Sequence, residues 1–212
     1  FLLCIVLLSL LTLNAFASVD VRSIFITTNE GLANNSVRYL FQDSKGFVWM
    51  GTLDGLSRYD GHSFVTFRPG IGDEISLADH HVKVITEDRN GFLWIFTSPE
   101  IFSCYDLKRD CFVDYTGCGE YKQEYKRKLE TSTGDIWLWH NEKNGCRKIT
   151  YKDGHFSSVI FNRKNGKLFS DSVNYVHEDE QGSVWICTQA GLVWVAGNQT
   201  QLFKKELSFV AG

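Results

Sequence analysis

Residues 43–52 read Asp-Ser-Lys-Gly-Phe-Val-Trp-Met-Gly-Thr, and a related segment returns three more times along the chain. The shared positions are an aspartate, a glycine three residues later and a tryptophan three residues after that. They are Asp43, Gly46 and Trp49, then Asp88, Gly91 and Trp94, then Gly134 and Trp137 without the aspartate, and finally Asp179, Gly182 and Trp185. Successive tryptophans lie 45, 43 and 48 residues apart. Self-similarity at this spacing indicates a repeat architecture.

Each repeat predicts a β-hairpin that belongs to a larger sheet. The Asp43 carboxylate is expected to accept the backbone N–H two residues on, and Gly46 to take the left-handed conformation that closes the turn. The return strand 47–52 is apolar on both faces, so both faces must be covered. Residues 55–59 and 62–67 supply a third and a fourth strand. Four strands in about 45 residues is the size of a β-propeller blade, so we predict an all-β fold of about four blades.

The composition excludes some partner classes. Of 212 residues, 43% are hydrophobic, so a packed core is expected. Lys and Arg number 22 against 25 Asp and Glu, and a net charge of -3 gives no basic field for nucleic acid. We therefore expect no nucleic-acid contact by this region.

The N-terminus predicts export. Residues 1–13 form an uncharged apolar run, and Asn14-Ala-Phe-Ala17 has the small-x-small form of a signal-peptidase site. The run falls short of the roughly 20 residues that a membrane-spanning helix needs. We predict a signal peptide over residues 1–17, with residues 18–212 released as a partial propeller outside the cytoplasm. The chain begins with Phe1, so a few upstream residues are expected to be missing.

The first unit, from Gly31-Leu-Ala-Asn-Asn-Ser-Val37 to Tyr59-Asp-Gly61, closely resembles the two-component regulator propeller repeat. That repeat builds periplasmic sensor regions of hybrid two-component systems in gut Bacteroidetes. The resemblance covers about residues 25–203, in units at roughly 31–67, 76–115, 121–161 and 167–203. The second unit departs at Phe96, where the pattern has glycine, and the third lacks the aspartate.

The resemblance implies a periplasmic, N-terminal sensor fragment of a ring of about seven blades. The parent would be a histidine kinase anchored in the inner membrane, and the fragment itself would not be an enzyme. The implied partners are an oligosaccharide released from a glycan and the rest of the same sensor chain, meaning further blades, a membrane helix and the kinase. A homodimer is an open alternative. The competing functions are a protein-interaction propeller and, less favoured, a propeller lyase or glycoside hydrolase.

The sequence supplies no catalytic constellation, and we expect neither a cofactor nor a metal. His80 and His81 are adjacent, so on a strand they point to opposite faces and cannot share a metal. The repeated Asp, Gly and Trp residues are interpreted as structural. Ligand-binding residues cannot be named from the sequence. Trp139 and Trp194 fall outside the repeated position and are the least explained tryptophans, but neither is favoured as a ligand contact.

Three further expectations concern local structure. Residues 25–28 are expected to form a closing strand for a last blade that is missing from this chain. Residues 120–130 are expected to form an exposed connection with at most one short helix. Cys104 and Cys111 flank a turn, and we favour small apolar strand residues over a disulfide for this pair.

Overall fold

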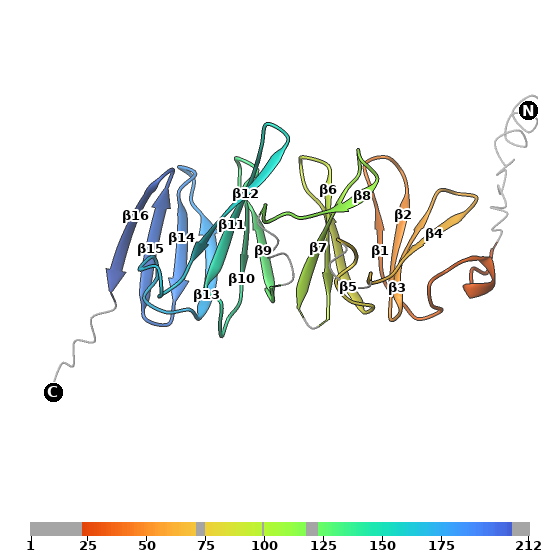
Figure 1. Ribbon diagram of the computed structural model, residues 1–212, viewed down its shortest axis with the longest axis horizontal. Helices are drawn as coiled ribbons and strands as arrows, with labels where there is room; N and C mark the ends of the chain where they lie inside the picture. The colour runs from red at the N-terminus through yellow and green to blue at the C-terminus, as the bar shows by residue number, and fades with distance from the viewer. Residues whose placement is uncertain (1–22, 71–74, 99, 118–122, 205–212) are drawn as a thin grey trace, which may run out of the picture.

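A computed structural model of the chain describes residues 23–70, 75–98, 100–117 and 123–204. The predicted signal peptide, residues 1–17, lies outside the described residues. Four antiparallel sheets of four strands follow one another in chain order along the long axis of the molecule (Figure 1). Within each sheet the strands are hydrogen-bonded in sequence order. These sheets are the blades of an incomplete β-propeller, and the predicted all-β fold is confirmed.

The blades have the following strands. Blade 1 contains β1 (Val37–Gln42), β2 (Val48–Thr52), β3 (Gly55–Tyr59) and β4 (Phe64–Phe67). Blade 2 contains β5 (Val82–Glu87), β6 (Phe92–Thr97), β7 (Ile101–Asp106) and β8 (Cys111–Val113). Blade 3 contains β9 (Arg127–Glu130), β10 (Ile136–Trp139), β11 (Cys146–Lys152) and β12 (His155–Phe161). Blade 4 contains β13 (Val173–Glu178), β14 (Val184–Thr188), β15 (Gly191–Ala196) and β16 (Gln199–Lys204).

The first strand of each blade lies at one edge of its sheet. Neighbouring blades approach closely at these strands, since β1 and β2 contact β5, and β10 contacts β13. The pairing of the first two strands shifts register near the start of β1, β5 and β13. Such bulges increase local twist and re-aim side chains at a sheet edge.

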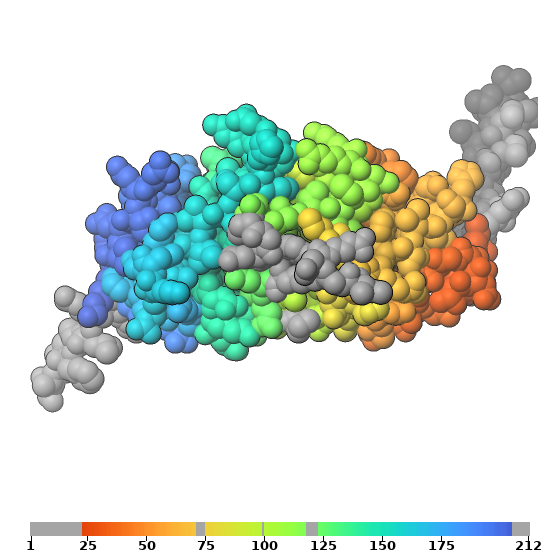
Figure 2. Space-filling view, in the orientation of Figure 1, coloured from red at the N-terminus to blue at the C-terminus, as the bar shows by residue number. Residues whose placement is uncertain are grey.

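Hydrophobic cores fill the spaces between blades, not the interior of any one sheet. Trp49 packs with Val82, Ile85 and Tyr105 between blades 1 and 2. Two further clusters, containing Trp94 and Trp137, join blades 2 and 3 and blades 3 and 4. Figure 2 shows the colours of the four blades following one another in chain order along the long axis.

The fourth repeat tryptophan lies in a different environment. Trp49, Trp94 and Trp137 are at most 1% exposed, whereas Trp185 is only partly buried. The neighbouring Val184 and Ile186 face blade 3, so the alternation of β14 turns Trp185 to the opposite face of blade 4. That face carries the ring of Phe203, stacked on Trp185 with centroids 6.0 Å apart.

The expectation of an exposed connection over residues 120–130 is wrong for its second half. Residues 127–130 are strand β9, and the Tyr125 side chain is fully buried in the core between blades 2 and 3. The strand could not be recognised from the sequence because it contains charged residues. Lys128 and Glu130 lie on β9, and their side chains contact blade 2. Within the described residues, no helix is long and apolar enough to cross a lipid bilayer.

Two more expectations concern a closing strand over residues 25–28 and the pair Cys104 and Cys111. Residues 25–27 lie in no strand, and Thr28–Glu30 is a short 3-10 helix, so the closing strand is not formed in this structure. Ile24 and Phe25 are 83% and 88% exposed. Cys104 and Cys111 are both free thiols, as favoured from the sequence, and burial raises the pKa of the Cys104 thiol.

Candidate functional site

The repeated aspartate connects each hairpin turn to the core between blades. Asp43 Oδ1 accepts the backbone N–H groups of Lys45 and Phe47, at 2.9 and 3.0 Å. Its other oxygen, Oδ2, accepts the indole N–H of Trp49 at 2.7 Å. The same pairs recur at Asp88 and Trp94 and at Asp179 and Trp185, both at 2.8 Å. One carboxylate therefore closes the turn and also orients the large side chain that fills the blade contact.

The repeated glycines all lie in the turn with positive φ, at 91° for Gly46, 82° for Gly91, 86° for Gly134 and 79° for Gly182. Residues with a Cβ rarely adopt this conformation, which explains the recurrence.

Blade 3 lacks this carboxylate, and the structure shows the consequence. Thr131 stands in place of the aspartate, and its Oγ1 accepts the Asp135 N–H at 3.0 Å. The turn is closed, but no second oxygen reaches the indole. Nε1 of Trp137 is buried and makes no hydrogen bond with any described residue.

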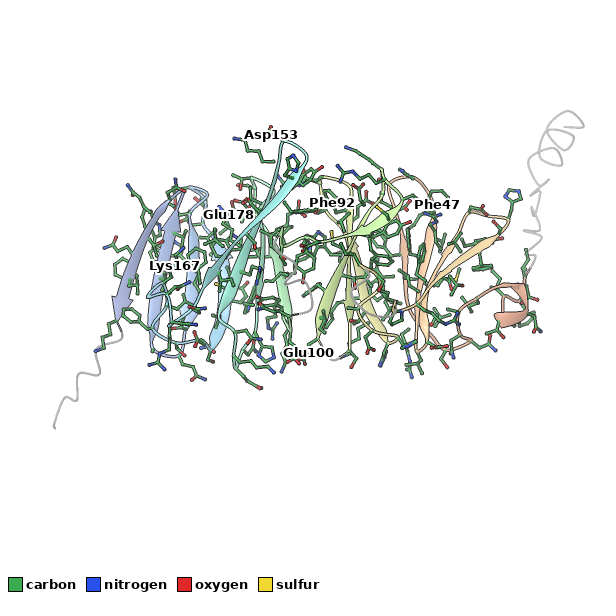
Figure 3. All side chains as sticks on the ribbon, in the orientation of Figure 1. Phe47, Phe92, Glu100, Asp153, Lys167 and Glu178 are labelled. Atoms are coloured by element: carbon green, nitrogen blue, oxygen red, sulfur yellow. The ribbon has the colours of Figure 1, made fainter. Side chains whose placement is uncertain are left out.

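Three glutamates, which the sequence did not single out, join neighbouring blades. They lie at the end of the sheets that carries the turns between first and second strands. Glu87 accepts the backbone N–H and the hydroxyl of Ser44, at 2.7 and 2.5 Å. Glu178, labelled in Figure 3, accepts the same two groups of Ser132, at 2.7 and 2.6 Å. Glu130 accepts Arg89 Nε at 2.8 Å. Each glutamate directly precedes the repeat position that holds Asp88, Thr131 or Asp179. This recurrence in the sequence could have identified the three glutamates as contact residues.

The opposite end of the sheets carries the connections between second and third strands and between blades. Glu100 lies at this loop end, at the lower edge of Figure 3, far from Phe47 and Asp153 at the upper edge. Its carboxylate reaches the buried His140 side chain at 3.1 Å and Lys126 Nζ at 3.5 Å. Asp54 and His80 form a similar pair between blades 1 and 2, at 2.8 Å. Polar pairs thus join successive blades at this end.

Glu100 itself has a strained backbone, with φ of 96°. The strained position places its carbonyl to accept the Tyr125 N–H at 2.6 Å and its carboxylate beside Lys126. No group of three or more His, Cys, Asp or Glu side chains within the described ranges is placed to hold a metal ion.

A hollow of about 330 Å³ lies between the first strands of blades 3 and 4. Its lining residues are Lys126, Arg127, Lys128, Leu129, Trp139, Tyr175 and Val176. The rings of Trp139 and Tyr175 stand nearly perpendicular, at 86°, with centroids 6.3 Å apart. Trp139, which the repeat does not explain, therefore lines a concave site, whereas Trp194 lies opposite Trp185 in the sheet of blade 4.

Comparison with known proteins finds a family match for the first repeat. Residues 31–54 match the family model described as two component regulator propeller. This segment of blade 1 is similar to a two component regulator propeller repeat. The matched regulator propeller segment contains β1, its turn and β2, with Asp43, Gly46 and Trp49.

Two known proteins share parts of this architecture. Histidine kinase P4 of Formosa agariphila is 40% identical over 52 residues, which cover 24% of this chain and 4% of the kinase. The extracellular domain assigned to the hybrid two component system BT3049 of B. thetaiotaomicron has a TM-score of 0.54 and 22% identity. That match covers 85% of this chain and 26% of the other, so this chain spans about a quarter of the solved domain. This structural likeness shows the fold.

Proposed function

We propose that this chain is part of an extracytoplasmic sensor in a hybrid two-component system. In this proposal, the propeller binds oligosaccharides released from a glycan and passes the signal across the inner membrane to a histidine kinase. The observation that carries the proposal is the match of residues 31–54 to the regulator propeller repeat, together with the likeness of 52 residues of the chain to a histidine kinase sequence. The predicted signal peptide is consistent with a periplasmic location.

The concave hollow between blades 3 and 4 is the candidate ligand site. Ligand sites in proteins are concave and combine aromatic walls with a few polar groups, as the Trp139, Tyr175 and Arg127 lining does here. The repeated Asp, Gly and Trp residues stay assigned to structure, because their side chains or backbone are used in turns and blade contacts.

Further blades of the same sensor chain are the proposed partner of the outer face of blade 4. Trp185 and Phe203 lie on that face, and Phe203 is 41% exposed. In blades 1 to 3 the equivalent tryptophans are covered by the next blade, so a fifth blade would complete the pattern.

Calorimetry tests the sensor proposal. The complete exported region is titrated with a panel of neutral and acidic oligosaccharides, and we expect saturable binding of at least one of them. A folded protein that binds no saccharide of the panel would contradict the proposal. Saturable binding of a periplasmic protein instead would favour the protein-interaction propeller.

A further inference from the structure

The hollow lies beside Trp139, at a repeat position that is Gly51 in blade 1, Phe96 in blade 2 and Cys187 in blade 4. Two residues after its repeat tryptophan, blade 1 has Gly51, and a Cβ added there would lie 2.6 Å from Cγ1 of Val82 on β5. The first strand of blade 2 therefore packs directly against the backbone of Gly51. Trp139 occupies the same repeat position in blade 3 and faces blade 4. An indole is too large to permit the close strand approach that Gly51 permits, and the hollow lies beside Trp139.

The positive charge at this hollow is concentrated on Arg127. Lys126 is paired with Glu100 and Glu142, at 3.5 and 3.6 Å. Lys128 turns to the other face of the sheet, where its ammonium lies 5.8 Å from the ring centroid of Trp94, and burial lowers its pKa.

Arg127, in contrast, is exposed and pairs with no carboxylate among the described residues. The one hydrogen bond that its side chain makes in the described structure goes from Nε to Asn141 Oδ1, at 3.4 Å. The guanidinium therefore keeps donors for a ligand. Trp139 is only 3% exposed, and its Nε1 is buried without a partner in the described part of the chain, so it lies beneath the surface of the hollow and is not counted as a ligand donor.

We propose that this hollow binds the acidic group of a sugar, either a uronate carboxylate or a sulfate ester, through Arg127. The proposal rests on the sensor function proposed above and specifies its ligand class. A guanidinium offers paired N–H donors that match the oxygens of a carboxylate or a sulfate. Tyr175, 55% exposed, supplies an aromatic face against which a sugar ring packs. The volume of about 330 Å³ is at the small end for ligand sites, which favours a short ligand.

The test compares matched ligands and matched variants of the complete exported region by calorimetry. The ligands are trigalacturonic acid and its methyl ester, which removes the charge, and a sulfated disaccharide and its desulfated form. The variants are Arg127→Gln and, as a control, Arg163→Gln, an exposed arginine outside the hollow. We expect one acidic ligand to bind about tenfold or more tightly than its uncharged partner, and Arg127→Gln to remove that preference. Arg163→Gln should leave it unchanged.

A second measurement locates the ligand. The indole Nε1–H signal of Trp139, assigned with Trp139→Phe, should shift when the acidic ligand is added to the unmodified protein. If uncharged and acidic forms bind equally, or Arg127→Gln keeps the preference, the acidic-sugar proposal is overturned while the sensor function stands. If no saccharide binds, the sensor function fails as well.

Discussion

Thr131 shows how much a single residue of the repeat contributes. In the other three blades, one aspartate both closes the hairpin turn and accepts the tryptophan N–H. With threonine in this place, the turn keeps its bond to the Asp135 N–H, but the N–H of Trp137 is buried without an acceptor. A buried donor without a partner costs about 1–3 kcal/mol.

Replacing this threonine by the repeat residue should stabilise the protein. We expect Thr131→Asp to raise the free energy of unfolding by about 1 kcal/mol, because the second carboxylate oxygen reaches Trp137 Nε1. Urea unfolding of Thr131→Asp, of Trp137→Phe and of the double variant measures the coupling energy between residues 131 and 137. A gain that persists in the Trp137→Phe background would contradict the explanation.

In blade 4, Asp179 accepts the indole N–H of Trp185, and this hydrogen bond should make the stability of the folded state depend on pH. The hydrogen bond from Trp185 holds the pKa of Asp179 below its ordinary value of 3.8. A carboxyl whose pKa is lowered by folding stabilises the folded state above its unfolded pKa, and this contribution is lost as the pH falls through the folded pKa.

We therefore expect the indole Nε1–H signal of Trp185 to titrate with a midpoint below 3.8, followed by NMR from pH 6 downward. Asp179→Asn should abolish that titration. A midpoint at or above the ordinary value would show that the bond does not favour the charged form.

At the scale of strands and turns, the blades are joined by backbone and carboxylate contacts as well as by apolar cores. Glu87 and Glu178 at the ends of β5 and β13 bind the turn of the preceding blade. Glu87→Ala should free the Ser44 amide and raise its hydrogen-exchange rate roughly fivefold, since one hydrogen bond contributes about 1 kcal/mol. Glu180→Ala is the control, because the Glu180 side chain makes no hydrogen bond or ion pair with a described residue. Equal exchange in both variants would rule out this role for Glu87.

Close approach between strands depends on Gly51. A methyl group there would meet Val82 at 2.6 Å, so Gly51→Ala should lower the free energy of unfolding by about 1–3 kcal/mol. Cys187→Ala tests the same repeat position in blade 4, where Cys187 is partly buried, and should cost less. Urea unfolding measures both, and a smaller loss for Gly51→Ala than for Cys187→Ala would refute the packing argument.

The elements also show what the sequence could and could not predict. The turns and return strands followed from local chemistry at Asp43 and Gly46, so those expectations hold. Strand β9 was missed because its residues are charged, and its place is set by pairing with β10 and by contact with blade 2. The hollow could not be foreseen, because it depends on which side chain of blade 3 meets which strand of blade 4.

At the scale of the whole molecule, a repeated tryptophan fills each contact between successive blades. The sequence repeat predicted this architecture, since Trp49, Trp94 and Trp137 each lie between two sheets. Ile24 and Phe25, which precede blade 1, are exposed, and Phe203 on β16, the last strand of blade 4, is partly exposed.

A crystal structure of the complete region that is proposed to be exported tests the central claim most directly. The blade arrangement predicts that Trp185 is buried against the first strands of a fifth four-stranded sheet, as Trp49 is buried against β5. A structure in which Trp185 faces solvent, or in which the tryptophan-bearing strands join one continuous sheet, would contradict it.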